Sequence, residues 1–272
     1  YAFIGAIAFA FSTYLIIILG VGHNTKALAI GYAPIVLAGL FKILDKKYLV
    51  GFIIGALGLG LQINANHYQM TYYFLMLVGL ITIINVFDDF FKKKIKDGLN
   101  KIGVVFATTL FAIFLNATAI LATQEYSDFS TRGSSEISIN PDGSEKDDLS
   151  GLSNEYITEY SYGKLESFNL IVPRFMGGGS SELIDKDSDF VKELKNYDNE
   201  SANIIYQNAR LYWGNQPIVA APAYIGISVF YIFLLALFFI NKKHLKWIIP
   251  AIIFSLTLSW GKNFQFLTDF MT

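Results

Sequence analysis

Long runs of uncharged, apolar residues constrain this chain more than any other feature of its sequence. The first run, residues 1–22, carries no charged residue and is long enough to cross a bilayer as a helix. Similar runs follow at residues 27–41, 48–61, 68–87, 102–123, 223–240 and 247–260. In lipid, a helix satisfies its backbone polar groups internally. The runs therefore predict an all-α polytopic membrane protein with about seven transmembrane helices.

The composition agrees with a membrane protein and excludes several classes of function. Of the 272 residues, 53% are hydrophobic and 16% are aromatic. A net charge of −1 provides no basic field for nucleic acid, so we expect no nucleic-acid partner. The absence of cysteine excludes disulfides, thiolate zinc sites and cysteine nucleophiles. Tyr1 lies inside the first apolar run with no Met before it, which predicts an internal fragment whose first run is a span rather than a signal peptide.

A polar interval at residues 124–216 separates the fifth apolar run from the sixth. It divides the chain into a five-span bundle at residues 1–123, a loop or lid segment, and a two-span hairpin at residues 217–272. Within the interval, the narrow apolar stripe of residues 186–197 predicts a short helix. The consecutive glycines Gly177 to Gly179 predict a hinge rather than a phosphate-binding loop.

The distribution of lysine predicts the orientation in the membrane. The loops at residues 42–47, 88–101 and 241–246 are rich in lysine, whereas the loops at 22–26 and 62–67 contain only Lys26. Cytoplasmic loops carry the excess of lysine and arginine in membrane proteins. The lysine-rich loops are therefore expected in the cytoplasm, and the interval at 124–216 is expected to be one long extracytoplasmic loop segment.

Two short patterns lie within or beside the apolar runs. The spacing of Gly51 and Gly55 predicts a close approach of two helices. The pair Asp88 and Asp89 suggests a metal-diphosphate site, but no second acidic motif accompanies it, and charge pairs are common at a membrane boundary. We therefore assign no metal ligands, and leave a divalent metal as an open alternative.

Several cationic and histidine side chains lie on the predicted external face. An anionic lipid head group needs such cations at the membrane interface, above an apolar groove for its tail. Solvated side chains that reach out to water are the alternative explanation of the same pattern. The candidates for binding the donor phosphate or the substrate are His23, Lys26, His67, Arg132, Lys164 and Lys262.

Two carboxylates on the same face are candidates for catalysis. A general base that deprotonates a sugar hydroxyl is normally an aspartate or glutamate near cations. Glu136 follows Arg132 by four residues, and Glu166 follows Lys164 by two. Neither spacing is specific by itself.

Several motifs in the same order resemble the bacterial YfhO membrane proteins, particularly those of Bacteroidetes. The resemblance extends over nearly the whole chain. The motifs are GHNTK at 22–26, QINANHYQMTYY at 62–73, STRGSSE at 130–136, SYGKLESFNLIVPRFMGGGSSE at 161–182, YWGNQP at 212–217 and LSWGKNFQFLTDF at 258–270.

The resemblance implies a GT-C type glycosyltransferase of the bacterial cytoplasmic membrane, which uses lipid-linked sugar donors outside the cytoplasm. The expected reaction is transfer of a sugar from a polyprenyl-phosphate donor to an envelope polymer or glycolipid acceptor. Membrane lipid is expected around the protein, and no cofactor is assigned. Enzymes of this type usually carry an acidic motif in their first external loop, and GHNTK contains no acid. The alternatives are a transporter or flippase of lipid-linked envelope components and a non-catalytic envelope protein. Spans almost free of charge favour the enzyme over a transporter.

Overall fold

The computed structural model describes residues 2–127, 129–130, 154–194, 196–266 and 268. Over these ranges all the regular elements are helices, and the extended pairing is limited to two isolated bridges, Gly177 with Tyr212 and Leu183 with Arg210. The all-α prediction is therefore confirmed. The chain divides into two compact units that we describe separately. The helical unit comprises His23–Ile157 and Asn241–Ser255, and the loop unit comprises Tyr1–Gly22, Thr158–Ile240 and Leu256–Thr272.

Four helical segments are long and apolar enough to cross a membrane, which supports the prediction of a membrane protein. They are Ala2–Gly20, which contains α1 (Ala2–Ala10) and α2 (Thr13–Gly20), then α3 (Asn24–Leu44), α5 (Tyr68–Phe91) and α6 (Ile95–Leu115). The helices α4 (Tyr48–Asn64) and α11 (Ile227–Phe239) are apolar but shorter. The count of seven spans stays a prediction. The remaining helices are α7 (Ala117–Ser127), α8 (Asn154–Ile157), η1 (Leu165–Leu170), α9 (Asp189–Leu194), α10 (Asn199–Asn208), α12 (Lys242–Ser259) and η2 (Gly261–Phe264).

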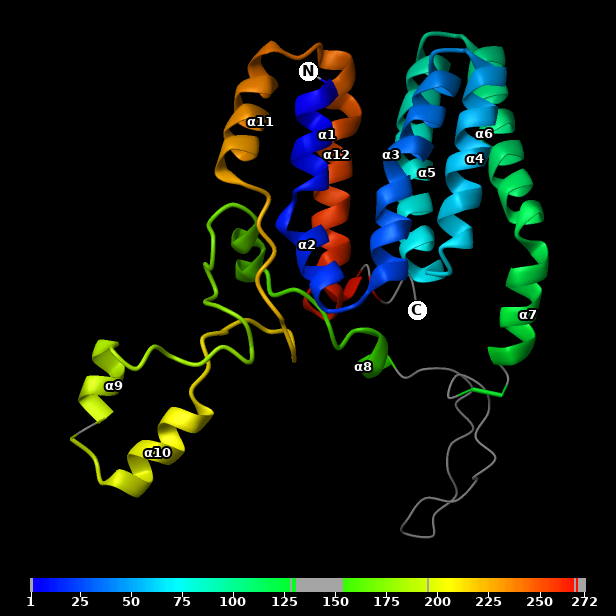
Figure 1. The fold of residues 1–272 in the computed structure, drawn as a ribbon. Helices are drawn as coiled ribbons and strands as arrows, with labels where there is room; N and C mark the ends of the chain where they lie inside the picture. Colours follow the sequence, from blue (N-terminus) through cyan, green and yellow to red (C-terminus); the bar gives the residue numbers. More distant parts are fainter. Residues whose placement is uncertain (1, 128, 131–153, 195, 267, 269–272) are drawn as a thin grey trace. The chain divides into compact units, whose positions relative to one another are not determined.

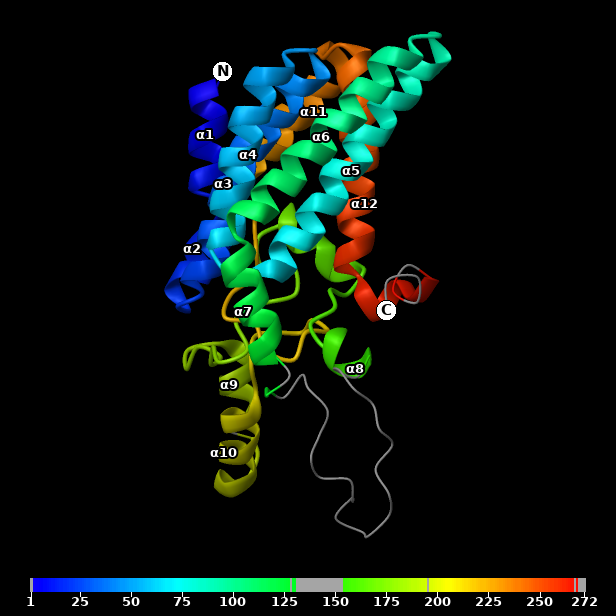
Figure 2. The same cartoon turned by 90° about the vertical axis from the view of Figure 1, so that its right-hand side faces the viewer.

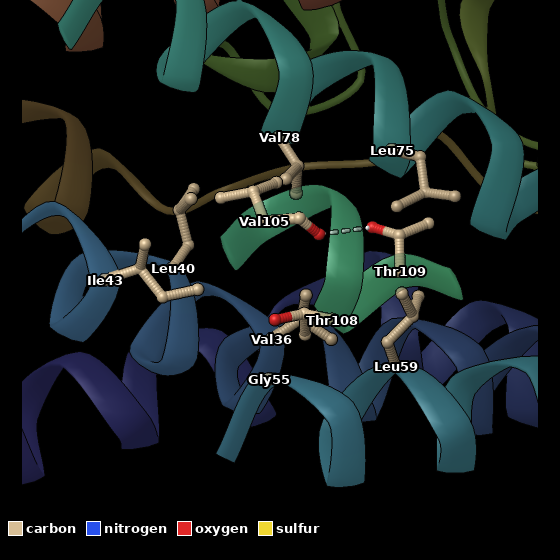
Figure 3. Close-up of a pocket in the computed structure, with 10 residues that line it drawn as sticks. All are labelled: Val36, Leu40, Ile43, Gly55, Leu59, Leu75, Val78, Val105, Thr108 and Thr109. Atoms are coloured by element: carbon tan, nitrogen blue, oxygen red, sulfur yellow. Dashed lines mark hydrogen bonds between the residues drawn. The ribbon is translucent and has the colours of Figure 1, made fainter. Parts of the chain in front are cut away.

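The core of the helical unit forms where α3, α4, α5 and α6 pack against one another (Figures 1 and 2). Leu40, Leu59 and Ile81 are almost fully buried there. Figure 3 shows apolar side chains of all four helices meeting around one small cavity, with Thr109 bonded back to Val105 of its own helix. The cavity measures about 20 Å³, which is space for a water molecule and not for a substrate.

Glycines set the distance between α3 and α4. A Cβ atom on Gly39 would lie 2.4 Å from the backbone nitrogen of Gly55, and one on Gly51 would lie 2.6 Å from the Ile43 side chain. A Cβ on Gly58 would also be too close to α3, at 2.9 Å from the Ile35 side chain. The close approach predicted from the glycine spacing is confirmed, with α3 as the partner.

Several helix boundaries differ from the apolar runs. The run at 102–123 is wrong as a single helix, because α6 begins at Ile95 and ends at Leu115. The side-chain amide of the C-cap residue Asn116 donates to the carbonyls of Gly60 and Ala112. Hydropathy left the first turns of α6 in a loop, although Asp97 and Lys101 are helical and have ion-pair partners. The chain then continues as α7.

The first apolar run forms two helices, α1 and α2, and the sixth run becomes helical only from Ile227. A hydrogen-bonded contact between the two runs accompanies both irregularities. Thr13 Oγ1 donates to the Tyr224 carbonyl at 2.8 Å and accepts from the Tyr224 amide at 2.7 Å. The backbone of Tyr224 therefore pairs with a side chain rather than within a helix, and α11 begins only at Ile227. Within residues 186–197, the predicted helix is confirmed in part as α9, and α10 follows with Asp198 as its N-cap.

The glycine contact yields a stability prediction. Gly39→Ala places a methyl group against the backbone of α4, so we expect the free energy of unfolding to fall by about 1–3 kcal/mol. Thermal unfolding of the purified protein in detergent measures this change. Gly31→Ala is the matched control on the same helix, since a Cβ there meets no atom within 4 Å. Equal melting temperatures for the two variants would contradict the close approach of α3 and α4.

Candidate functional site

The predicted binding and catalytic residues divide between the two units. His23, Lys26 and His67 belong to the helical unit, whereas Lys164, Lys262 and Glu166 belong to the loop unit. Arg132 and Glu136 lie outside the described residues, so their predicted roles stay predictions.

The first group gathers at the end of the helical unit opposite its lysine-rich turns. His67 precedes α5, and its Nδ1 atom is buried with no hydrogen-bond partner among the residues that the structure describes. Burial lowers the pKa of His67 below its usual 6.5, and the nearby positive charge of Lys26 and the imidazole of His23 lower it further. His67 is therefore neutral at pH 7, and can offer a hydrogen bond to a ligand there but no positive charge.

This depressed pKa yields a prediction about pH. Below pH 6.5 the unfolded chain protonates this imidazole more readily than the folded protein, so the stability that the neutral form contributes is lost as pH falls through that range. We expect the melting temperature to fall further between about pH 8 and about pH 5 in the parent protein than in the variant His67→Gln. His244→Gln, which removes an exposed imidazole, is the control. An identical pH dependence in the parent and His67→Gln would contradict the burial of His67.

In the loop unit, three sequence motifs that are far apart in the chain meet. They are residues 161–169, 212–217 and 259–264. The first and third are joined by four hydrogen bonds: Tyr162 N to Ser259 O at 2.8 Å, Trp260 Nε1 to Ser167 Oγ at 2.8 Å, Lys262 N to Ser161 Oγ at 2.9 Å, and Asn263 Nδ2 to Tyr162 O at 2.8 Å.

Glu166 joins the second motif to the first. This side chain is 1% exposed, in the first turn of η1. Its Oε1 accepts from the Tyr212 hydroxyl and from Gln216 Nε2 at 2.9 Å, and its Oε2 accepts from the amides of Gly163 at 3.0 Å and Asn215 at 3.3 Å. Four donors match the acceptor capacity of an ionised carboxylate. No described lysine or arginine forms an ion pair with it.

Two tyrosines near Glu166 remain protonated, and the hydroxyl of one of them, Tyr212, donates to the carboxylate. Burial, followed by the charge of Glu166, raises the pKa of Tyr162 to about 12. Burial and the hydrogen bond to Glu166 raise the pKa of Tyr212 as well. Hydrogen bonding around the carboxylate therefore persists across the physiological range of pH.

A cavity of about 320 Å³ opens beside this network. It is lined by Gly163, Lys164, Leu165, Glu166, Met176, Asn215 and Asn263. Lys164 and Asn215 are exposed, and no hydrogen bond within the described chain uses the side-chain amide of Asn215. A cation and amide groups at one cavity suit a ligand that carries hydroxyl groups and a negative charge. Lys262 is adjacent in sequence to a lining residue but does not line the cavity itself.

The three consecutive glycines near this cavity are packed rather than free to bend. A Cβ on Gly177 would lie 1.6 Å from the Leu211 carbonyl oxygen, and one on Gly179 would lie 2.4 Å from the Ala220 carbonyl oxygen. A Cβ on Gly178 would lie 2.1 Å from the carboxylate of Glu182. All three amides donate hydrogen bonds within the chain, so the structure replaces the predicted hinge with close packing.

Sequence reasoning missed the partners of Glu166. Tyr212, Asn215 and Gln216 lie in the motif YWGNQP, which stood out only through the resemblance and received no role. Their separations from Glu166, 46 to 50 residues, give no periodic signal. The available signal was the concentration of hydrogen-bonding residues at 212–216 directly before an apolar run.

Comparison with known proteins adds no assignment. No protein-family model, no curated protein and no solved structure matches the chain. The resemblance to the YfhO proteins therefore stays a prediction. Over the described part of the chain, no group of three or more histidine, aspartate or glutamate side chains is placed to hold a metal ion.

The network around Glu166 yields a stability prediction. Glu166→Gln turns an amide NH₂ group toward donors that need an acceptor, so we expect a loss of about 1–3 kcal/mol in the free energy of unfolding. Tyr212→Phe removes one donor, so its effect should be smaller. Thermal unfolding and limited proteolysis of residues 158–217 measure these effects. Glu159→Gln, the same change at an exposed carboxylate, is the control, and a similar small effect of both glutamine variants would contradict the structural role of Glu166.

Proposed function

We propose that the protein transfers a sugar from a polyprenyl-phosphate-linked donor to a cell-envelope acceptor outside the cytoplasm, and that the cavity beside Glu166 binds the polar part of the donor. The observation that carries this proposal is the set of lining residues Lys164, Asn215 and Asn263, in a chain with four candidate membrane-crossing segments. The lysine-rich turns of the helical unit then face the cytoplasm of a bacterial cell.

The chemistry of a lipid-linked donor supports this use of the cavity. Its tail stays in the bilayer while the phosphate and sugar leave it, so a protein that binds it needs apolar helices and a polar cavity in one chain. Charge develops on the phosphate as the glycosidic bond breaks, and the ammonium group of Lys164 would stabilise it. The amides of Asn215 and Asn263 would bind sugar hydroxyls.

In this proposal Glu166 is a positioning residue. Its four acceptor positions are occupied by donors within the chain, so a hydroxyl of the acceptor finds no free position on the carboxylate. Through the amides of Gly163 and Asn215, it holds the backbone on both sides of the cavity. Glu136, the other carboxylate predicted as a general base, and Arg132 remain candidates for the chemistry.

The placement of charge favours an enzyme over a transporter. In the described candidate spans, the charged residues stand in the first two turns or the last turn of a helix: Lys26 and Lys42 in α3, Asp88 and Asp89 in α5, and Lys96, Asp97 and Lys101 in α6. A transporter of charged substrates would place ionisable groups at mid-depth.

Binding of the donor tests the proposal. Lys164→Ala is expected to weaken binding of a polyprenyl-phosphate sugar by about tenfold or more, because a charged hydrogen bond to phosphate is lost. Asn215→Ala should lower affinity for the sugar-bearing donor but not for polyprenyl phosphate alone. Lys186→Ala, a change at another exposed lysine of the loop unit, is the control. Failure of the parent protein to bind such a donor, or equal binding by Lys164→Ala, would overturn the proposal.

A further inference from the structure

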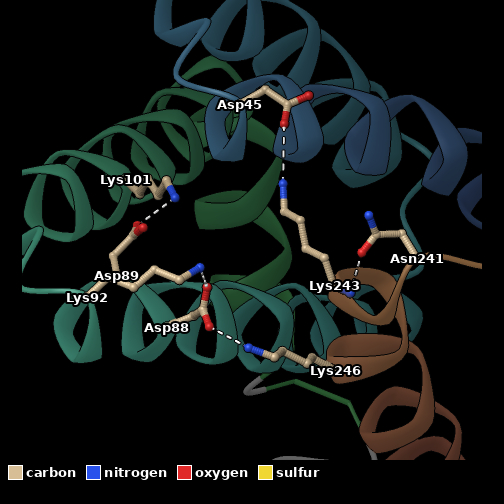
Figure 4. Close-up of polar contacts among 8 residues, drawn as sticks. All are labelled: Asp45, Asp88, Asp89, Lys92, Lys101, Asn241, Lys243 and Lys246. Carbon is tan, nitrogen blue, oxygen red and sulfur yellow. Dashed lines mark hydrogen bonds and ion pairs between the residues drawn. The ribbon is translucent and has the colours of Figure 1, made fainter.

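Three lysine-bearing segments of the helical unit converge on one surface. They are residues 42–48, which join α3 to α4, residues 88–101 around the turn from α5 to α6, and residues 241–246 at the start of α12. Figure 4 shows the two ion pairs that join the third segment to the others, Lys243 with Asp45 and Lys246 with Asp88. Lys46 Nζ lies 2.5 Å from Asp97, Lys246 Nζ lies 2.6 Å from Asp88, and Lys243 Nζ lies 4.0 Å from Asp45. We call this surface the basic end.

The aspartates of the basic end are already paired. Asp88 contacts both Lys92 and Lys246, and Asp89 forms a buried pair with Lys101 at 2.6 Å. The three segments contain eleven lysines against four aspartates, so pairing leaves a large excess of positive charge. The lysines with no ion pair to a described carboxylate are Lys42, Lys47, Lys93, Lys94, Lys96 and Lys242.

The turn between α5 and α6 combines this charge with exposed apolar side chains. Phe91 is 85% exposed and Ile95 is 58% exposed, on either side of Lys92 to Lys94. Backbone hydrogen bonds from Lys93 to Phe90 and from Lys94 to Asp89 keep the turn tight. Apolar side chains beside lysines at the end of a membrane helix match the boundary between acyl chains and head groups.

We propose that the basic end binds the head groups of anionic phospholipids, with Phe91 and Ile95 in the acyl layer and Lys93, Lys94 and Lys96 on the phosphates. Charge complementarity identifies the ligand. The aspartates are already paired with lysines of the protein, so anions that neutralise the remaining lysines must come from outside it. The adjacent apolar residues favour a lipid over a soluble phosphate. This site lies in the helical unit and is independent of the proposed sugar transfer.

Lipid retention by the purified full chain tests the proposal. Native mass spectrometry counts phosphatidylglycerol and phosphatidylcholine bound to the detergent-solubilised protein during titration with each lipid. We expect the parent to prefer phosphatidylglycerol, and Lys93→Gln/Lys96→Gln to weaken that binding by about tenfold, since each lysine near an anionic surface contributes separately. Lys186→Gln/Lys192→Gln makes the same change of charge on the loop unit and should bind as the parent does.

Two further measurements separate a lipid from a free phosphate. Phe91→Ser leaves the charge unchanged, so it should weaken binding of phosphatidylglycerol but not of glycerol phosphate. The melting temperature of Lys93→Gln/Lys96→Gln without added lipid should equal that of the parent, because both lysines are exposed and unpaired with any described carboxylate. Equal retention of the two lipids by the parent would overturn the proposal. The proposal would also be overturned if glycerol phosphate displaced phosphatidylglycerol completely and Phe91→Ser bound phosphatidylglycerol as the parent does.

Discussion

The contact of α3 with α4 requires facing positions that carry no side chain. Gly39 and Gly55 bring the two backbones close enough to touch, and the other helices of the unit then pack against this pair. In lipid, where apolar side chains gain little by leaving their surroundings, such close packing is the main source of helix association. Because α3 and α4 run in opposite directions, their contact also places the lysine-rich turns at one end and His67 at the other.

The loop unit depends on a different interaction, the burial of one carboxylate among four donors. An unpaired buried charge is costly, so the segments that supply the donors must stay in place around Glu166. The same requirement fixes Asn215 and Gly163 beside the cavity. Apolar packing contributes less here, since many large side chains of the unit, such as Leu165 and Trp213, are exposed.

The sequence was sufficient for features that depend on local pattern. Hydropathy located most of the helices, and the glycine spacing indicated the close contact of α4 with another helix. It was insufficient where side chains bond to backbone groups far away in the chain. The break at Asn116 and the late start of α11 at Ile227 follow from such bonds, which leave no periodic signal. The packing of Gly177 depends on an equally distant contact, with the backbone carbonyl of Leu211. Glu166 was predicted as a catalytic carboxylate, which stays a prediction, and the donors that surround it could not be predicted.

The pairing of Thr13 with Tyr224 has a consequence for synthesis of the protein. These residues are 211 positions apart, so the first segment reaches its partner only after the intervening chain has been made. At ribosomal rates this delay is roughly 10–40 s. By contrast, α3 to α6 are contiguous and can assemble as they emerge. During that interval the hydroxyl of Thr13 lacks the Tyr224 backbone as its partner, and a carbonyl one turn earlier in its own segment can accept from it instead, as the Val78 carbonyl does from Thr82.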